Sequence, residues 1–171
     1  MIRSVAIFGS GNIGSQIAAC FANAGIPVHV FDLTGELCQH NVKQLLTMHP
    51  VPLIRPEQKH YISTYAWDDI DALERLKSCD LIIEAIIEDL SAKQDLFKTI
   101  MPYCHSCAWI ASNTSGLSIE SISRALPKER REHFLGIHFF NPPRYMPLVE
   151  LIFSPYTNQD QLEPLTHVLI K

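Results

Sequence analysis

A glycine pattern near the amino terminus constrains the fold of this chain more than any other feature. The sequence Gly9-Ser10-Gly11-Asn12-Ile13-Gly14 is a G-x-G-x-x-G that follows a short apolar run and opens a helical pattern. In this context Gly9 permits a tight turn, Gly11 lets the backbone approach a pyrophosphate closely, and Gly14 lets a helix pack against a strand. The motif therefore predicts a strand–turn–helix unit that binds a dinucleotide.

The same segment predicts which dinucleotide is bound. The first N–H groups of the helix, at Asn12 and Ile13, lack partners within the helix and lie at its positive end, where phosphates bind. Asp32 ends the next apolar run, near the position expected for a ribose-binding acid. A carboxylate there repels a 2′-phosphate, and no Arg or Lys follows it at residues 33–35. We therefore expect NAD as the cofactor, in preference to NADP or FAD.

Short apolar runs alternate with helical patterns along the chain, which favours a parallel sheet with crossover helices. Most of the runs lack polar alternation, as expected for strands covered on both faces. We expect an α/β, Rossmann-type doubly wound, mostly parallel sheet with helices on both faces, in one dinucleotide-binding domain over residues 1–171. The expected strands are 4–8, 28–31, 81–84, 109–112 and 134–138, and the expected helices are 14–24, 37–46, 70–76, 91–101 and 119–125.

Two stretches depart from this alternation. Residues 48–59 contain three prolines and cannot form one regular helix. They predict a helical and proline-rich excursion over about residues 36–62, with a surface loop of no particular role as the alternative. Residues 158–170 have a helical pattern without a stop signal such as a following glycine. This ending predicts that the chain is a fragment of a larger protein.

Composition narrows the class of protein. The chain is 47% hydrophobic and 19% charged, as is ordinary for a globular domain. A net charge of −4 gives no electrostatic reason to expect a nucleic-acid partner. No apolar run approaches the roughly 18–20 residues of a membrane span, and the first residues do not resemble a signal peptide. We expect a cytoplasmic protein without a membrane partner.

Five cysteines are present, and an odd number without a secretion signal argues against a disulfide framework. Cys104 and Cys107 form a single C-x-x-C. A structural zinc site needs four ligands, and no second pair lies at a suitable spacing. A redox pair would start a helix, whereas this pair follows one. We therefore expect no metal site and an incidental C-x-x-C.

Chemically active groups are concentrated between Ser112 and Glu150. His138 directly follows an apolar run, which places it at the carboxyl edge of a strand, where doubly wound sheets bind ligands. Glu150 follows a proline-rich turn that can return it to the imidazole. A carboxylate on one ring nitrogen fixes the tautomer and leaves the other as a base. The pair predicts a site that deprotonates an alcohol; a structural histidine and a solvated glutamate are the alternatives.

These motifs together resemble the NAD-binding domain of the 3-hydroxyacyl-CoA dehydrogenases of fatty-acid β-oxidation. HFFNP followed by LVE is far more restrictive than the glycine motif. The NPPRY sequence and the proline-rich residues 48–59 most resemble the dehydrogenase part of large bacterial multifunctional proteins, which join a hydratase to a dehydrogenase. The matching pieces are GSGNIG at 9–14, DLIIEAIIEDLSAKQDLF at 80–97, SNTSGLSI at 112–119 and HFFNPPRYMPLVEL at 138–151.

The resemblance implies roles at matching positions. His138 corresponds to the catalytic base and Glu150 to its carboxylate partner, while Ser115 corresponds to the residue that hydrogen-bonds the substrate oxygen. Asn141 corresponds to an asparagine near the nicotinamide and the substrate. The implied reaction is the NAD-dependent oxidation of an L-3-hydroxyacyl-CoA to a 3-ketoacyl-CoA. The implied cofactor contacts beyond the glycine loop are Glu88, Lys93, Asn113, Ser115 and Asn141.

Alternatives to these roles stay open. Glu88 and Lys93 also fit an exposed ion pair at the start of a helix. The resemblance further implies an acyl-CoA thioester substrate, further domains of the same polypeptide and a homo-oligomer. In the family a C-terminal helical domain, which binds substrate and pairs subunits, completes the site. The resemblance implies that this domain is absent here, so the isolated chain is expected to bind NAD and to catalyse poorly. A related dehydrogenase of small hydroxy acids and a non-catalytic NAD-binding module are the alternative functions.

Overall fold

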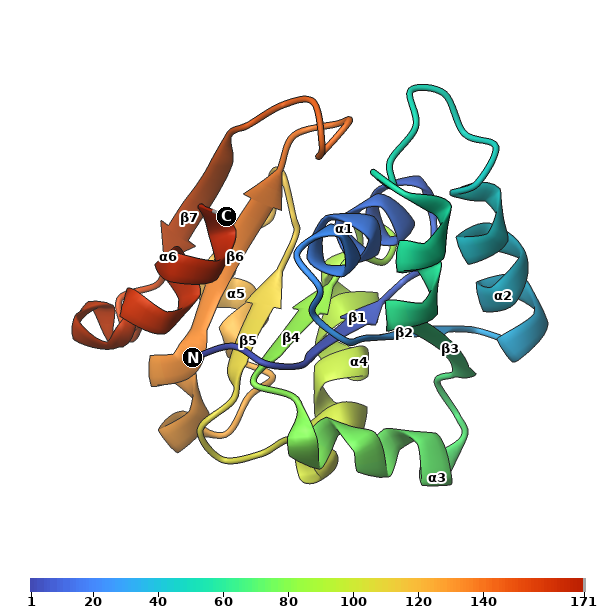
Figure 1. Ribbon diagram of the computed structural model, residues 1–171. Helices are drawn as coiled ribbons and strands as arrows, with labels where there is room; N and C mark the ends of the chain where they lie inside the picture. The colour runs from blue at the N-terminus through green and yellow to red at the C-terminus, as the bar shows by residue number, and fades with distance from the viewer. Residues whose placement is uncertain (171) are drawn as a thin grey trace.

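The computed structural model describes residues 1–170 and contains one seven-stranded sheet (Figure 1). The strand order is β3-β2-β1-β4-β5-β6-β7. All neighbouring pairs are parallel except β6 and β7, which are antiparallel. This confirms the doubly wound, mostly parallel α/β fold. The strands are β1 (Val5–Phe8), β2 (Val28–Asp32), β3 (Ile62–Ala66), β4 (Leu81–Glu84), β5 (Trp109–Ser112), β6 (Phe134–Phe139) and β7 (Val149–Phe153).

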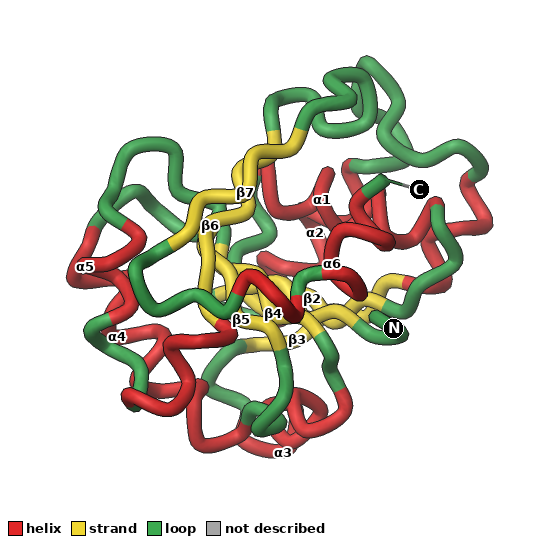
Figure 2. Tube along the Cα trace, turned by 90° about the vertical axis from the view of Figure 1, so that its left-hand side faces the viewer, coloured by secondary structure: helices red, strands yellow, loops and turns green. Residues whose placement is uncertain are grey.

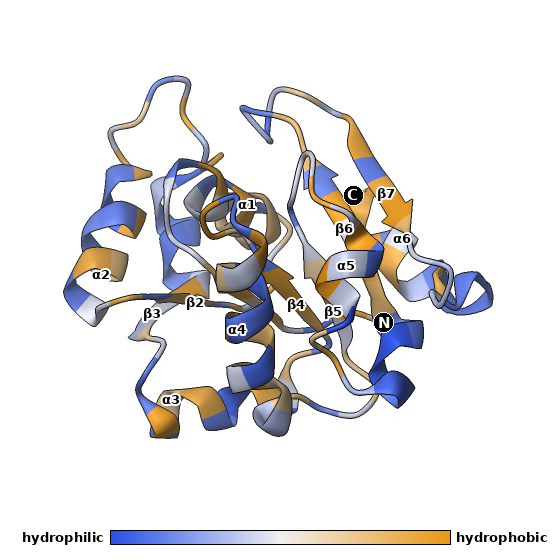
Figure 3. Ribbon diagram, turned by 180° about the vertical axis from the view of Figure 1, so that it is seen from behind, coloured by the Kyte–Doolittle hydropathy of each residue, from blue (hydrophilic) through white to orange (hydrophobic). Residues whose placement is uncertain are grey.

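Helices cover both faces of the sheet, as Figures 1 and 3 show from opposite sides. One core includes residues of α1, α2 and α6, and the other includes residues of α3, α4 and α5. The α-helices are α1 (Asn12–Asn23), α2 (Gly35–Gln44), α3 (Ile70–Leu73), α4 (Leu90–Ile100), α5 (Ile119–Ser123) and α6 (Glu163–Leu169). The 3-10 helices are η1 (Pro56–Tyr61), η2 (Glu74–Ser78), η3 (Met101–Tyr103), η4 (Lys128–His133) and η5 (Gln159–Gln161). Over residues 1–170, none of these helices has the length and apolarity needed to cross a bilayer.

The central strands are apolar because both of their faces are covered. In β1, the side chains of Val5 and Ile7 join the core under α1, while Ala6 and Phe8 join the core under α4. Every residue of β1, β4 and β5 is buried. Continuous apolar runs of this kind are expected in a parallel sheet. The strand order reverses between β1 and β4, so the ligand-binding crevice is expected above the carboxyl ends of these two strands.

Two strands were absent from the sequence prediction, and both lie at sheet edges. β3 and β7 each pair with one neighbour, and their side chains are mostly half-buried or exposed. Such strands do not need a continuous apolar run, which removes the signal used for the central strands. The expected helix at 158–170 was wrong in extent: the structure has η5 and then α6, with Pro164 in the first turn of α6. A proline is tolerated in the first turn of a helix, whereas in the interior it removes a backbone hydrogen bond and kinks or breaks the helix.

The proline-rich segment (residues 48–59) packs against the end of α1. Asn23 donates from Nδ2 to the Pro52 carbonyl at 2.9 Å and accepts at Oδ1 from the Ile54 N–H at 2.9 Å. Pro52 and Leu53 are buried. The segment therefore has a fixed place in the fold and is not a free surface loop.

Candidate active site

The turn between β1 and α1 has the backbone that its glycines predict. Gly9 has a φ of +99°, and a Cβ there would lie 2.5 Å from the Ala85 carbonyl oxygen. A Cβ on Gly14 would lie 1.9 Å from the Gly9 carbonyl oxygen. Any side chain at either position would displace backbone, so both glycines are required by the close approach of α1, β1 and the end of β4.

The amino end of α1 is open to a ligand. The helix begins at Asn12 with Gly11 as its N-cap, and no side chain of the described residues caps it. A Cβ on Gly11 would meet no atom within 4 Å, so the space beside Gly11 is open. Unpaired N–H groups and the positive end of a 12-residue helix suit a phosphate group in that space. The loop therefore fits the pyrophosphate of a dinucleotide.

Asp32, at the end of β2, is held beside this loop. Its Oδ2 accepts hydrogen bonds from the Ser10 N–H at 2.6 Å and the Ser10 hydroxyl at 2.5 Å. Its Oδ1 accepts from the Leu33 N–H at 2.8 Å. Asn41 of α2 donates to the Ser10 hydroxyl at 3.0 Å. Because a carboxylate oxygen can accept two hydrogen bonds, Oδ1 retains capacity for a ligand hydroxyl.

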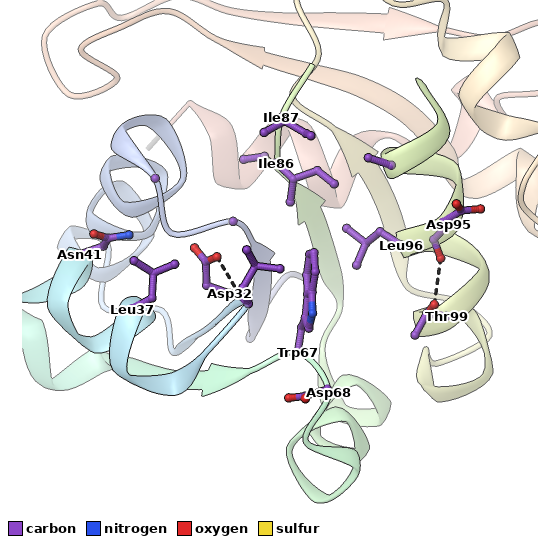
Figure 4. A pocket seen from close by; sticks show the side chains of 15 residues that line it. Asp32, Leu37, Asn41, Trp67, Asp68, Ile86, Ile87, Asp95, Leu96 and Thr99 are labelled. Carbon is purple, nitrogen blue, oxygen red and sulfur yellow. Dashed lines mark hydrogen bonds between the residues drawn. The ribbon is translucent and has the colours of Figure 1, made fainter. Parts of the chain in front are cut away.

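A cavity of about 670 Å³ lies next to Asp32 and the glycine loop. Figure 4 shows the Trp67 side chain between Asp32 and Leu96, with Ile86 and Ile87 along one side of the cavity. Trp67 was not predicted as a site residue, because it follows β3, a strand that was not predicted. A flat aromatic ring among aliphatic side chains suits a planar ring of a ligand. The remaining lining residues are Gly9, Gly11, Leu33, Leu37, Asn41, Asp68, Ala85, Ala92, Asp95 and Thr99.

His138 and Glu150 face each other across the antiparallel pair β6–β7. The His138 Nδ1 lies 2.8 Å from the Glu150 Oε2. An ionised carboxylate can only accept a hydrogen bond, so Nδ1 carries the hydrogen and Nε2 is left as a basic nitrogen. The Phe140 ring centroid lies 4.7 Å from that of the imidazole. The contact expected from the proline-rich turn is therefore present, and the register of β6 and β7 produces it.

The loop that carries Ser115 lies beside the end of β6. Asn113 accepts at Oδ1 from the Phe139 N–H at 2.9 Å, which joins the residue after β5 to the residue after His138. Ser115 itself is exposed. On the other side, Gln16 of α1 donates to Asn141 Oδ1 at 3.4 Å. The structure thus gathers Asn113, Ser115, His138 and Asn141 at the carboxyl edge of β5 and β6.

Lys93 of α4 is buried. The alternative interpretation, an exposed ion pair of Glu88 and Lys93 at the start of a helix, predicted that it would be exposed. Its side chain is 1% exposed, and its Nζ lies 2.5 Å from Glu84 Oε1 and 3.3 Å from Glu88 Oε2. Glu84, at the end of β4, is completely buried and accepts at Oε2 from the Ser112 hydroxyl at 2.5 Å. Glu84 was not predicted as part of the site. The feature that could have indicated it is a single carboxylate at the end of an otherwise apolar strand.

Glu88 binds the loop of residues 114–116. Its Oε1 accepts from the Thr114 hydroxyl at 2.5 Å, the Ser115 N–H at 3.0 Å and the Gly116 N–H at 3.1 Å. Partial burial of Glu88 favours its neutral form, but these hydrogen bonds and the Lys93 charge outweigh burial and lower the pKa of the carboxyl below its ordinary value. Glu88 is therefore an anion that organises the Ser115 loop.

The loop after β6 (residues 141–148) is attached to the proline-rich segment. Arg144 donates from Nη1 to the Val51 carbonyl at 2.7 Å and to the Leu53 carbonyl at 3.1 Å. The Tyr145 hydroxyl also donates to the Val51 carbonyl, at 2.9 Å. Figure 2 shows both segments at the same end of the molecule. The proline-rich segment and the loop after β6, which are far apart in sequence, are thus joined by hydrogen bonds next to Asn141.

The C-x-x-C pair has the context expected from the sequence, since it follows α4 and η3 and precedes β5. Cys104 donates from Sγ to the Ile100 carbonyl at 3.2 Å, and Cys107 is exposed. Over residues 1–170, no group of three or more His, Cys, Asp or Glu side chains is placed to hold a metal ion. The pair adds nothing to the site at the carboxyl edge.

A family model, curated proteins and solved structures that match this chain all point to the same family. Residues 4–171 match the family model described as 3-hydroxyacyl-CoA dehydrogenase, NAD binding domain. A Bacillus subtilis protein named as a probable 3-hydroxyacyl-CoA dehydrogenase is 35% identical over 96% of the chain, and the mitochondrial hydroxyacyl-coenzyme A dehydrogenase of Homo sapiens is 33% identical over 96%. The crystal structure of the dehydrogenase part of multifunctional enzyme 1 from C. elegans superposes with a TM-score of 0.82 at 28% identity, over 98% of the chain.

These similar proteins are all longer than the matched region. The chain spans 23% of the Bacillus protein, 55% of the human protein and 39% of the C. elegans chain. The similarity therefore concerns one part of each of them.

Proposed function

The chain belongs to the 3-hydroxyacyl-CoA dehydrogenase family as its NAD-binding domain, and from this premise we propose that it serves the oxidation of L-3-hydroxyacyl-CoA to 3-ketoacyl-CoA in fatty-acid β-oxidation. The observation that carries the proposal is the 2.8 Å contact between His138 and Glu150 at the carboxyl edge of the sheet. It supplies a base beside a fold that binds a hydride acceptor.

NAD fits the crevice above β1 and β4. In the proposal, the N–H groups of Asn12 and Ile13 bind the pyrophosphate, and Asp32 accepts hydrogen bonds from the adenosine ribose. The apolar cavity lined by Trp67 and Leu96 takes the adenine. No basic residue follows Asp32 at residues 33–35 to balance a 2′-phosphate, which favours NAD over NADP.

His138 acts as the general base in this proposal. Its Nε2 takes the proton of the C3 hydroxyl, and the Glu150 carboxylate stabilises the imidazolium that results. The Ser115 hydroxyl orients the substrate oxygen, and Asn141 lies on the cofactor side of the same edge. A bound NAD would supply the hydride acceptor, to which both electrons of the C3–H bond would pass as the carbonyl forms.

Further protein is needed to enclose the acyl chain. The Glu150 side chain is 50% exposed, and Leu148, Ile152 and Phe153 around β7 are exposed apolar residues. We place the dinucleotide-binding domain over residues 1–171 and propose that other parts of the same polypeptide, or a second subunit, cover this face. Enclosure strengthens the charge interactions of the site by excluding water.

Binding and turnover test this function separately. Calorimetry of the chain with NADH should show binding that is much tighter than binding of NADPH. Two activities of the full-length protein should be compared: reduction of acetoacetyl-CoA and reduction of free 3-keto acids. NADH binding with preferred reduction of the CoA thioester supports the proposal. Binding without any turnover would identify a non-catalytic module, and a preference for free acids would identify a dehydrogenase of small hydroxy acids.

A further inference from the structure

A set of charged side chains extends from the end of β4 to the loop that carries Ser115. Glu84 and Lys93 are 0% and 1% exposed and lie 2.5 Å apart, whereas Glu88, the third member, is 44% exposed. We call Glu84, Lys93 and Glu88 the charged triplet. Buried ion pairs are costly to form, so their burial calls for a specific role.

The ammonium of Lys93 donates hydrogen bonds to Glu84 and to the Ile86 carbonyl, and it forms an ion pair with Glu88. An ammonium has three N–H donors, and three acceptors surround this one. They are Glu84 Oε1 at 2.5 Å, Glu88 Oε2 at 3.3 Å and the Ile86 carbonyl at 3.5 Å. Lys93 is therefore held inside the protein between the carboxylates of Glu84 and Glu88.

Glu84 holds the inner end of the triplet. Besides Lys93, its carboxylate accepts from the Ile86 N–H at 2.8 Å through Oε1 and from the Ser112 hydroxyl at 2.5 Å through Oε2. Ser112 ends β5, directly before the loop of residues 113–116. The inner end is thus attached to both β4 and β5, the strands whose carboxyl ends border the site.

Glu88 holds the outer end and binds the loop directly. One of its oxygens accepts from the N–H groups of Ser115 and Gly116 and from the Thr114 hydroxyl, while the other faces Lys93. Hydrogen bonds to a charged acceptor are stronger than those to a neutral one. Ser115 is exposed, so these backbone contacts and its chain neighbours decide where its hydroxyl lies.

We propose that the charged triplet is a positioning device for Ser115, in which Glu84 fixes Lys93, Lys93 fixes Glu88, and Glu88 fixes the backbone of residues 115 and 116. The role of Glu88 and Lys93 is then to place the substrate-orienting hydroxyl, and direct contact with the cofactor is not required. The inference rests on the proposed function in one respect, since it takes Ser115 as the contact to the substrate oxygen.

A double-mutant cycle in the full-length protein tests this role. Ser115→Ala should lower kcat for acetoacetyl-CoA reduction about 10²-fold, as loss of one oriented donor does. Glu88→Gln should lower it by up to about 10²-fold, because the hydroxyl is then misplaced. The double variant should fall no more than about twofold below Ser115→Ala, since both changes remove the same interaction. A double variant whose loss is the product of the two single losses would overturn the proposal.

Cofactor affinity separates positioning from direct contact. Calorimetry should give an NADH dissociation constant for Glu88→Gln within about twofold of the parent value. A tenfold weaker dissociation constant would instead show that Glu88 contacts the cofactor. The matched control is Glu74→Gln, which removes a carboxylate from the exposed pair with Lys77 on η2, remote from the site. Its kcat and NADH affinity should equal those of the parent.

Amide hydrogen exchange tests the same device without any turnover. In this chain, Glu88→Gln should make the Ser115 and Gly116 amides exchange about tenfold faster, the effect of weakening one hydrogen bond by roughly 1.4 kcal/mol. Glu84→Gln combined with Lys93→Met should have the same effect, because it removes both buried charges together and leaves neither unpaired. Unchanged exchange in both variants would refute the device. If the parent protein does not reduce acetoacetyl-CoA, the proposed function fails. The exchange rates of the Ser115 and Gly116 amides still show whether the charged triplet holds the loop.

Discussion

At the scale of single residues, the chemistry depends on which ring nitrogen of His138 carries a hydrogen. The Glu150 carboxylate lies 2.8 Å from Nδ1 and settles that hydrogen there. Both residues were expected from the sequence, because a histidine after an apolar run and a glutamate after a proline-rich turn are local features. Glu84 was not expected, because its function depends on Lys93 and Ser112, which are distant in sequence and meet only through the fold.

The cysteines allow a test of side-chain placement. Burial raises the pKa of Cys20, Cys38 and Cys79 to about 11 and that of Cys104 to about 12. Because only a thiolate reacts, at pH 8 roughly one part in 10³ or less of each of these thiols is reactive. Cys107 is exposed. Labelling of the native chain with a thiol-specific disulfide reagent at pH 8 should therefore show one fast thiol.

The control for the labelling is Cys107→Ser, in which the fast phase should disappear. In concentrated urea all five thiols should react quickly. As the pH rises toward 11, the four slow thiols should become faster, since deprotonation increases. Two or more fast thiols in the native chain at pH 8 would show that the burial of these cysteines is wrong.

At the scale of elements, the proline-rich segment is the clearest addition to the sequence prediction. It was expected as an excursion whose role was open, and the structure attaches it to α1 through Asn23 and to the loop after β6 through Arg144. The edge strands β3 and β7 were not predicted, because half-exposed strands lack the continuous apolar pattern of β1, β4 and β5. Central strands were therefore predictable from their continuous apolar runs, whereas edge strands depended on pairing with a neighbour.

Arg144→Met should release the proline-rich segment. Methionine keeps much of the aliphatic stem but removes the donors to the Val51 and Leu53 carbonyls. Because these bonds are partly exposed, global stability in urea should fall by only about 1 kcal/mol. Hydrogen exchange of peptides that cover residues 48–55 should become at least several-fold faster.

The control for this variant is Arg124→Met, which removes an exposed guanidinium paired with Glu120 on α5. It should leave exchange at residues 48–55 unchanged. If Arg144→Met also leaves it unchanged, the contacts of Asn23 and the Tyr145 hydroxyl are enough to hold the segment, and the Arg144 hydrogen bonds have no energetic weight.

At the scale of the whole molecule, one sheet edge brings together the proposed site residues of this domain. The carboxyl ends of β1, β2 and β4 surround the proposed NAD crevice, and those of β5 and β6 present the Ser115 loop and His138. The topology of a parallel sheet makes this convergence predictable once the strands are known. What could not be predicted is which further side chains surround His138, Glu150 and the glycine loop. Trp67 follows an unpredicted strand, and the charged triplet depends on contacts between α4, β4 and β5.

The central claim is that His138 is the base of an NAD-dependent 3-hydroxyacyl-CoA dehydrogenase. His138→Gln tests it most directly, because glutamine can still hydrogen-bond Glu150 across β6 and β7 but cannot accept a proton at neutral pH. For this variant of the full-length protein, kcat for acetoacetyl-CoA reduction should fall about 10²–10⁴-fold. The NADH dissociation constant from calorimetry should stay within about twofold of the parent value. Near-normal turnover by the variant would contradict the account.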